Sequence, residues 1–252
     1  METNILKMIT IADCMSIANA LCGFLAMFFI LKGENILSAQ LLLLAVVFDC
    51  LDGTVARMLN TRSGMFGENI DSLADIVSFG VAPAIIMYMI SPSQWIIIPA
   101  ALVVICGLLR LTRYNTLVVY QEGPTKTFLG LPIPVTSTIL AALILSSFTD
   151  MYLISVLMII ISILMVSEVK YPKIKNNKIL IPFAIVVILC MIPGVNTLLY
   201  SIPSYVLLIA VAVYIFGVFI KNLNLQNSKL SNQINRSYKN TKHEVQSLHK
   251  KQ

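Results

Sequence analysis

The chain has 252 residues, of which 58% are hydrophobic and 12% are charged. Its mean hydropathy is +0.85. A soluble domain carries about twice that charged fraction, so the composition excludes an ordinary soluble globular protein. Apolar runs of about 17–25 residues are long enough to span a hydrocarbon core. The composition therefore predicts an all-α polytopic membrane protein.

The histidines and cysteines exclude several kinds of chemistry. Both histidines, His243 and His249, lie in the polar C-terminal tail, which excludes Ser-His-Asp, Cys-His and histidine-zinc sites within the membrane part. The five cysteines have no CxxC spacing and fall in or beside apolar segments. They are predicted to be small buried apolar residues. The first apolar stretch is too long for a cleavable signal peptide, so none is expected.

Eight apolar segments are predicted to form transmembrane helices. They cover residues 10–31, 36–57, 68–90, 94–114, 131–148, 151–168, 179–195 and 203–221. With the N-terminus in the cytoplasm, all of the 18 basic residues except Lys32 fall on the cytoplasmic side. The positive-inside rule then gives cytoplasmic termini. Trp95, at a short outer loop, is predicted to anchor the chain at the interface.

Four aspartates gather at the cytoplasmic ends of the second and third predicted helices. Asp49 and Asp52 are three residues apart, and Asp71 and Asp75 are four apart, so each pair lies on one helical face. A central intramembrane aspartate costs about 2.5–3.5 kcal/mol. Four such charges repel one another unless a cation neutralises them, so the segment predicts a divalent-metal site.

The residues around the aspartates suggest a phosphorylated ligand. Gly53 and Ala56 continue the stripe of Asp49 and Asp52 with little side-chain bulk, and Arg57 adds a forked donor suited to phosphate. Gly67 precedes Asp71 and Asp75 on their stripe, and Ser63 in the intervening loop offers a hydroxyl. Carboxylates suit Mg²⁺ or Mn²⁺. Two such ions suit phosphoryl-type displacement, with a carboxylate as base.

The spacing of these residues resembles a known family. The pattern D-x-x-D-G-x-x-A-R followed by G-x-x-x-D-x-x-x-D is the signature of the CDP-alcohol phosphotransferases. Every motif position is filled, by Asp49, Asp52, Gly53, Ala56, Arg57, Gly67, Asp71 and Asp75. The resemblance implies a membrane enzyme in which an alcohol attacks a CDP-linked lipid and CMP is released.

The resemblance also implies roles for individual residues. The first three aspartates would hold metal, and Asp75 would complete the second metal site and act as the base. The residues implied to contact the CDP-lipid are Asn19, Asp52, Gly53, Ala56, Arg57, Ser63 and Gly67. For Asn19, a role in helix packing is an equal alternative. Homodimerisation is also implied by the family, whereas no nucleic-acid partner is expected.

Downstream blocks resemble the phosphatidylserine synthase branch of that family, whose acceptor is L-serine. They are the stretches at 71–83, 110–115 and 128–134. The lipid substrate would be CDP-diacylglycerol or its archaeal equivalent, CDP-archaeol. Serine needs a cation for its carboxylate, and the candidates are Arg110, Arg113 and Lys126. The two arginines could instead follow the positive-inside rule or contact lipid headgroups.

The resemblance divides the chain into three parts. Residues 1–170 would form the catalytic core, with six transmembrane helices. Residues 171–221 would add two C-terminal helices, and residues 222–252 form a polar cytoplasmic tail.

Two other functions compete with serine transfer. A transferase of the same family could accept glycerol phosphate or inositol phosphate, which favour a larger basic pocket. A divalent-cation transporter would need polar residues along a path through the membrane, but the carboxylates cluster at one side.

Overall fold

The computed structural model describes residues 5–58, 65–120, 127–172 and 177–220. It divides into two compact units, Met1–Ala212 and Val213–Gln252. The boundary falls within the helix Ile202–Ile220. Of the second unit, only residues 213–220 are described, and they are helical. The first unit contains the aspartates.

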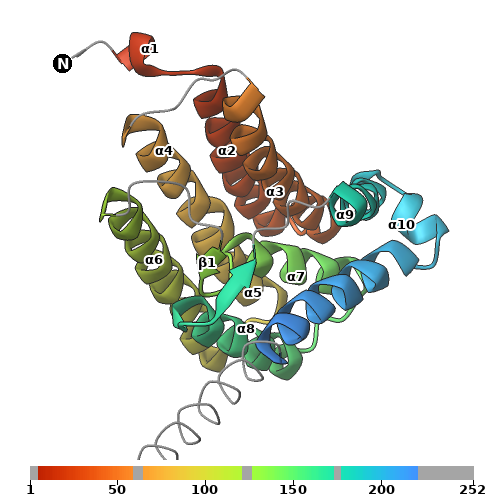
Figure 1. Cartoon of the computed structure of the whole chain (residues 1–252). Helices are drawn as coiled ribbons and strands as arrows, with labels where there is room; N and C mark the ends of the chain where they lie inside the picture. The colour runs from red at the N-terminus through yellow and green to blue at the C-terminus, as the bar shows by residue number, and fades with distance from the viewer. Residues whose placement is uncertain (1–4, 59–64, 121–126, 173–176, 221–252) are drawn as a thin grey trace, which may run out of the picture. The chain divides into compact units, whose positions relative to one another are not determined.

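Two long helices form an antiparallel pair at the start of the first unit (Figure 1). A short helix α1 (Ile5–Met8) precedes α2 (Ile11–Leu31) and α3 (Asn35–Met58). The Thr10 hydroxyl accepts a hydrogen bond from the Asp13 amide and the Asp13 carboxylate accepts one from the Thr10 amide, so α2 begins with a capping box. Gly33, with φ of +82°, makes the tight turn between the two helices. The pairing brings the N-terminal half of α2 beside the aspartate end of α3.

The third long helix changes its geometry within the span. It consists of α4 (Met65–Asp75), the π-helical segment η1 (Ile76–Val81) and α5 (Ala82–Ile90). In η1 the Ala82 amide donates to the Val77 carbonyl, five residues back. Segments of this kind recur at functional sites. Here the segment directly follows Asp75.

The next helices pack around this broken helix (Figure 1). The 3₁₀ turn η2 (Gln94–Ile96) leads into α6 (Ile97–Tyr120), which contacts η1, α5 and α8 (Met151–Val166). Asp150 caps α8 by accepting from the Leu153 amide at 2.9 Å. In the C-terminal half of α6, Asn115 hydrogen-bonds Ser72 on α4.

Helix α7 (Pro134–Leu145) lies inside the first unit. Every residue from Thr136 to Leu145 is buried, and the helix contacts α3, α5, α8 and η1. The strand β1 (Thr127–Leu129) precedes α7 and pairs antiparallel with β2 (Lys170–Pro172), with Phe128 opposite Tyr171. The two strands join the connection before α7 to the one after α8.

The last helices of the first unit are α9 (Asn177–Met191), α10 (Val195–Leu198) and the beginning of Ile202–Ile220. Gln40 on α3 donates to the Cys190 carbonyl at 3.4 Å, which links α9 to α3. Helix α9 therefore extends the bundle on the side of α3.

The predicted all-α polytopic architecture is confirmed. Five helices are long and apolar enough to cross a membrane, namely Ile11–Leu31, Asn35–Val55, Met65–Ile90, Gln94–Leu117 and Ile202–Ile220. Shorter apolar helices cover Pro134–Leu145, Met151–Val166 and Ile181–Met191. Each predicted segment thus coincides with an apolar helix. Patterning did not predict the π-helical segment or the pair of short strands.

Candidate active site

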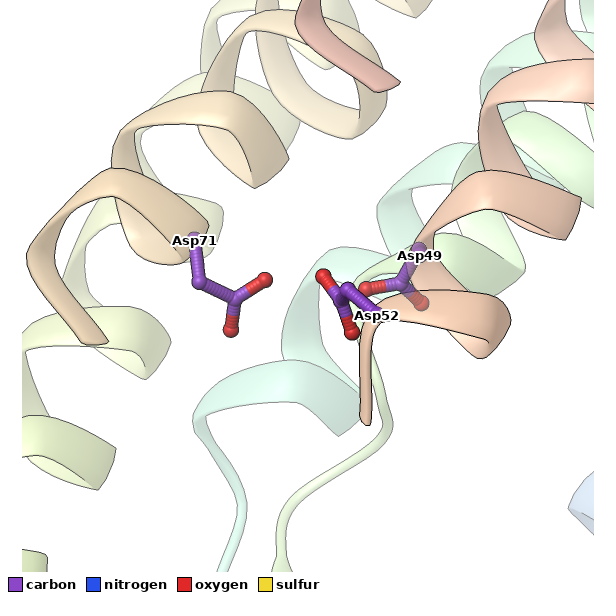
Figure 2. Close-up of side chains that lie close together, drawn as sticks. All are labelled: Asp49, Asp52 and Asp71. Carbon is purple, nitrogen blue, oxygen red and sulfur yellow. The ribbon is translucent and has the colours of Figure 1, made fainter. Parts of the chain in front are cut away.

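Three aspartates from two helices converge in the first unit. Asp49 and Asp52 project from α3 and Asp71 projects from α4, and their side chains point toward a common space (Figure 2). One oxygen of each carboxylate lies within 4.8 Å of the others. The fold therefore brings the pair on α3 together with Asp71, from which a loop separates it in the sequence.

These carboxylates fit a divalent cation. All three are partly exposed, but Asp71 Oδ1 is buried and has no hydrogen-bond partner among the described residues. A buried carboxylate oxygen without a donor is costly. Hard carboxylate oxygens from neighbouring helices are what Mg²⁺ and Mn²⁺ prefer. The donor set and the unpartnered oxygen thus both favour a metal site.

Helix α2 adds two polar contacts to the aspartates. The Ser16 hydroxyl donates to Asp52 Oδ2 at 2.9 Å, and the Asn19 amide donates to Asp75 Oδ1 at 3.2 Å. The Oδ1 atom of Asn19 is buried and has no partner among the described residues. Asn19 therefore contacts the site and retains an unused acceptor there.

Asp75 differs from the other three aspartates. It is only 6% exposed and lies outside the group of three described above. Its carboxyl interacts with that of Asp49 and is attracted by Arg110. Asp75 is thus placed beside the convergent carboxylates, where a donor from α2 fixes one of its oxygens.

Arg110 on α6 faces the aspartates. Its side chain is 6% exposed, and its charge is attracted by Asp75 and Asp49. The guanidinium also lies 5.9 Å from the centre of the Tyr114 ring, within the range of a cation–π contact. Nearby, the Asn115 amide donates to the Ser72 hydroxyl at 2.9 Å and ties α6 to α4.

Arg113 has different partners, although it lies one turn from Arg110. Its Nη1 donates to the Val166 carbonyl at 3.0 Å. Its Nη2 donates to the carbonyls of Leu129 at 2.8 Å and Met165 at 3.1 Å. The predicted pair of serine-binding arginines is therefore divided between the aspartates and the C-terminal end of α8. A serine-binding role for either arginine stays a prediction.

The structure gives less information about the remaining candidate residues. A Cβ atom at Gly53 would meet nothing within 4 Å, so the space beside it is open, and Gly67 is buried on α4. Ala56 and Arg57 lie on α3, but their side chains are outside the description. Ser63 and Lys126 lie outside the described residues. Their roles stay predictions.

A comparison with protein families identifies the family. The model of the CDP-alcohol phosphatidyltransferase family matches residues 9–169, which include the three convergent aspartates, Asp75 and Arg110. The chain belongs to the CDP-alcohol phosphatidyltransferase family. The family assignment that rested on the aspartate motif is thus confirmed.

Curated relatives give the assignment more detail. The archaetidylserine synthase of Methanothermobacter thermautotrophicus is 39% identical over 180 residues, or 69% of this chain and 74% of the relative. The CDP-diacylglycerol–serine O-phosphatidyltransferase of Methanocaldococcus jannaschii is 37% identical over 219 residues, or 85% of this chain and 96% of the relative. The Bacillus subtilis protein of the same name is 39% identical and covers 65% of this chain and 91% of its own length.

Sequence reasoning missed two groups of polar residues near the site. Ser16 lies three residues before Asn19 on α2, so helical periodicity could have indicated it. Ser72 and Asn115 meet across two helices. No local pattern indicates that contact.

Proposed function

We propose that the chain transfers a phosphatidyl group from a CDP-linked lipid to L-serine and releases CMP. The observation that carries the proposal is the meeting of Asp49, Asp52 and Asp71 within 4.8 Å between α3 and α4. Membership of the family supports the CDP-lipid, and the names of the relatives support serine. The lipid is CDP-diacylglycerol or CDP-archaeol, and the products are phosphatidylserine or archaetidylserine with CMP.

The reaction is a direct displacement at phosphorus. The serine hydroxyl oxygen forms a bond to the phosphorus that carries the lipid, and the bond from that phosphorus to CMP breaks. CMP leaves with the electron pair, and the hydroxyl proton passes to the Asp75 carboxylate. Asp75 suits this role because Asn19 holds one of its oxygens at 3.2 Å and the other remains for the proton.

Asp49, Asp52 and Asp71 would hold Mg²⁺ or Mn²⁺, with Asp75 completing a second position. When bound, the ions supply positive charge that offsets the charge developing on the phosphate oxygens and on CMP. Gly53, with open space at its Cα, is the place where the diphosphate approaches the α3 backbone. Ala56, Arg57, Ser63, Gly67 and Asn19 complete the CDP-lipid contacts.

Arg110 is the strongest candidate for the serine carboxylate. It is buried, and it is attracted by Asp75 and Asp49, so a serine carboxylate bound there would bring the hydroxyl toward the base. Arg113 is the weaker candidate because it donates to the carbonyls of Leu129, Met165 and Val166. Lys126 is retained as a third candidate.

The site faces the cytoplasm in this proposal. The support is the distribution of basic residues, of which only Lys32 lies on the opposite side. Both termini then lie in the cytoplasm as well. Residues 1–170 form the catalytic core, 171–221 the added helices and 222–252 the tail. The family match at 9–169 supports the first boundary, and a homodimer remains the expected assembly.

The acceptor is tested by incubating purified protein with each CDP-lipid and one acceptor at a time. Serine is expected to release CMP, whereas glycerol phosphate and inositol phosphate are expected to release little. CMP release with a phosphorylated acceptor and not with serine would assign the chain to another branch. Metal flux through proteoliposomes without CDP-lipid would instead favour a transporter.

The base is tested with Asp75→Asn. This variant is expected to abolish CMP release while the folded protein still binds CDP-lipid, because the amide keeps the shape of the side chain but cannot take the proton. Normal turnover in the variant would exclude Asp75 as the base.

A further inference from the structure

The π-helical segment η1 and Pro83 together leave two backbone carbonyls without their usual donors. In an α-helix the carbonyls of Ser78 and Phe79 would accept from the amides of residues 82 and 83. The Ala82 amide donates instead to Val77, and Pro83 has no amide hydrogen. Both residues are fully buried, so each carbonyl would cost about 1–3 kcal/mol without another donor.

Helix α7 supplies both donors from its first turns. The Ser137 hydroxyl donates to the Ser78 carbonyl at 2.7 Å. The Thr136 hydroxyl donates to the Phe79 carbonyl and also lies 2.8 Å from the Ile133 carbonyl of its own helix. Thr136 and Ser137 are 0% exposed. Two side chains of α7 therefore satisfy the carbonyls that η1 and Pro83 leave open.

Ser78 in η1 also links this segment to the aspartates through hydrogen bonds. The Ser78 hydroxyl donates to the Asn19 carbonyl at 2.8 Å, and the Asn19 amide donates to Asp75 at 3.2 Å. Gly23 permits this approach of α2, since a Cβ atom there would lie 2.6 Å from Ser78 Cα. A buried chain of hydrogen bonds thus runs from α7 through η1 and α2 to Asp75.

We propose that Thr136, Ser137 and Ser78 are positioning residues that set the rotation of Asp75 about its helix. The inference rests on the proposed role of Asp75 as base. The π-helical turn contains one residue more than an α-helical turn, so its loss would rotate α4 by about 100° relative to α5. That rotation would move Asp75 away from Asn19 and Asp49. The Ser137 hydroxyl stabilises the π-helical arrangement because it pairs the Ser78 carbonyl that this arrangement exposes. The Thr136 hydroxyl pairs the Phe79 carbonyl that Pro83 leaves open and holds η1 against α7.

The test is the double variant Thr136→Val/Ser137→Ala, which removes both donors with little change in volume. Its kcat for CMP release is expected to fall about 10- to 100-fold, since a misplaced catalytic group can cost about 10²-fold. The KM for serine is expected to stay within about twofold, because Arg110 lies on α6 and not on the rotated helix. The KM for CDP-lipid is expected to rise, because the rotation also moves Gly67 and Asp71 on α4. Hydrogen exchange of the amides at 76–82 is expected to quicken.

Three further variants separate positioning from packing. Thr138→Val removes a hydroxyl that donates only within α7, to the Pro134 carbonyl at 2.9 Å, and is expected to leave kcat unchanged. Thr136→Ser keeps the donor and is expected to retain activity. Adding Pro83→Ala to Thr136→Val supplies an amide for the Phe79 carbonyl, so kcat is expected to recover in part. Equal losses in Thr138→Val and the double variant would overturn the proposal.

The hydrogen-exchange measurement still tests the positioning role if the proposed function is wrong. A wild-type protein that releases no CMP with any acceptor would contradict the proposed function alone. Amide exchange at 76–82 would still decide the present inference. Unchanged exchange in the double variant would overturn it, and faster exchange there with unchanged exchange in Thr138→Val would support it.

Discussion

Two polar regions of the first unit differ in how fully the protein satisfies their hydrogen bonds. At the end of α8, Arg113 donates to three backbone carbonyls. Beside it the Gly130 amide donates to Val169 at 2.9 Å, and the Leu131 amide donates to Leu164 at 3.0 Å. Among the aspartates, by contrast, Asp71 Oδ1 and Asn19 Oδ1 are buried without a partner among the described residues.

This difference distinguishes polar side chains that stabilise the fold from polar side chains that serve the reaction. The last carbonyls of a helix lack partners within it, and a cation there is favourable, so Arg113 completes the end of α8 with protein atoms alone. The aspartates form an incomplete set that a bound ion and substrate would complete. Changes in the first region are therefore expected to lower stability, and changes in the second to lower activity.

The largest expected effect is that of Asp71→Asn. CMP release is expected to fall about 10³-fold, because the variant removes a carboxylate that would hold the ions at the reacting phosphate. Without added metal the thermal midpoint is expected to stay or rise, since one repelling charge is lost. Mg²⁺ is expected to raise the midpoint of the wild type but not of the variant.

The control for this variant is Asp150→Asn, which changes an aspartate that caps α8. Asparagine is an equally good cap, so activity and stability are both expected to remain. A large fall in the midpoint of Asp71→Asn without metal would mean that this carboxylate is structural.

Gly130→Ala is expected to have the largest effect on stability. Gly130 has φ of +79°, which costs another residue about 1–2 kcal/mol, and its Cβ atom would collide with the Met165 carbonyl and the Arg113 guanidinium. We expect a loss of stability beyond that figure, measured as a lower thermal midpoint or a lower yield of folded protein. Gly53→Ala, where the Cβ atom meets open space, is the stability control.

The two arginines give a direct comparison of the regions. Arg110→Gln is expected to reduce kcat/KM for serine about 10²-fold, because it removes the cation proposed for the serine carboxylate. Without metal it is also expected to lower the midpoint, because Asp75 and Asp49 lose an attracting charge. Arg113→Gln is expected to lower the midpoint while the folded fraction keeps most of its activity. If Arg113→Gln lost activity with serine and Arg110→Gln lost only stability, Arg113 would be the serine-binding residue and Arg110 the structural one.

Ser16→Ala is expected to have the smallest effect. It removes one hydrogen bond to Asp52, of about 1.5–3 kcal/mol for a charged partner at most, from a carboxylate that still has its other contacts. CMP release is expected to fall about fivefold with the same midpoint. A steady-state titration of metal would show whether the loss lies in metal affinity.

Helical periodicity predicted the membrane helices and the aspartate stripes because both are local properties. The spacing of Asp49 and Asp52, and of Asp71 and Asp75, determines which face each pair occupies. Periodicity alone did not predict that the aspartates of the two helices converge. That expectation came from the resemblance of the aspartate motif to a known family. Arg110 and Arg113 could not be told apart, because their partners lie on other helices.

The π-helical segment could not be predicted for a similar reason. Pro83 removes a donor, which ordinarily predicts a kink. Whether the freed carbonyls meet donors depends on Thr136 and Ser137, which lie 57 and 59 residues away from them in the sequence. Whether the helix bends at Pro83 or forms a π turn therefore depends on the packing of α7 against η1.

The shortness of α7 bears on how the protein assembles in a bilayer. At about 1.5 Å per residue, its 12 residues reach about 18 Å, which is less than a hydrocarbon core of about 30 Å. A non-helical backbone at this depth is tolerated only where protein surrounds it, and Gly130, Leu131 and Ile133 before α7 are buried. The segment from β1 to α7 thus depends on neighbouring helices for its place in the membrane. We expect it to reach its final position only after α3, η1 and α8 have gathered around it.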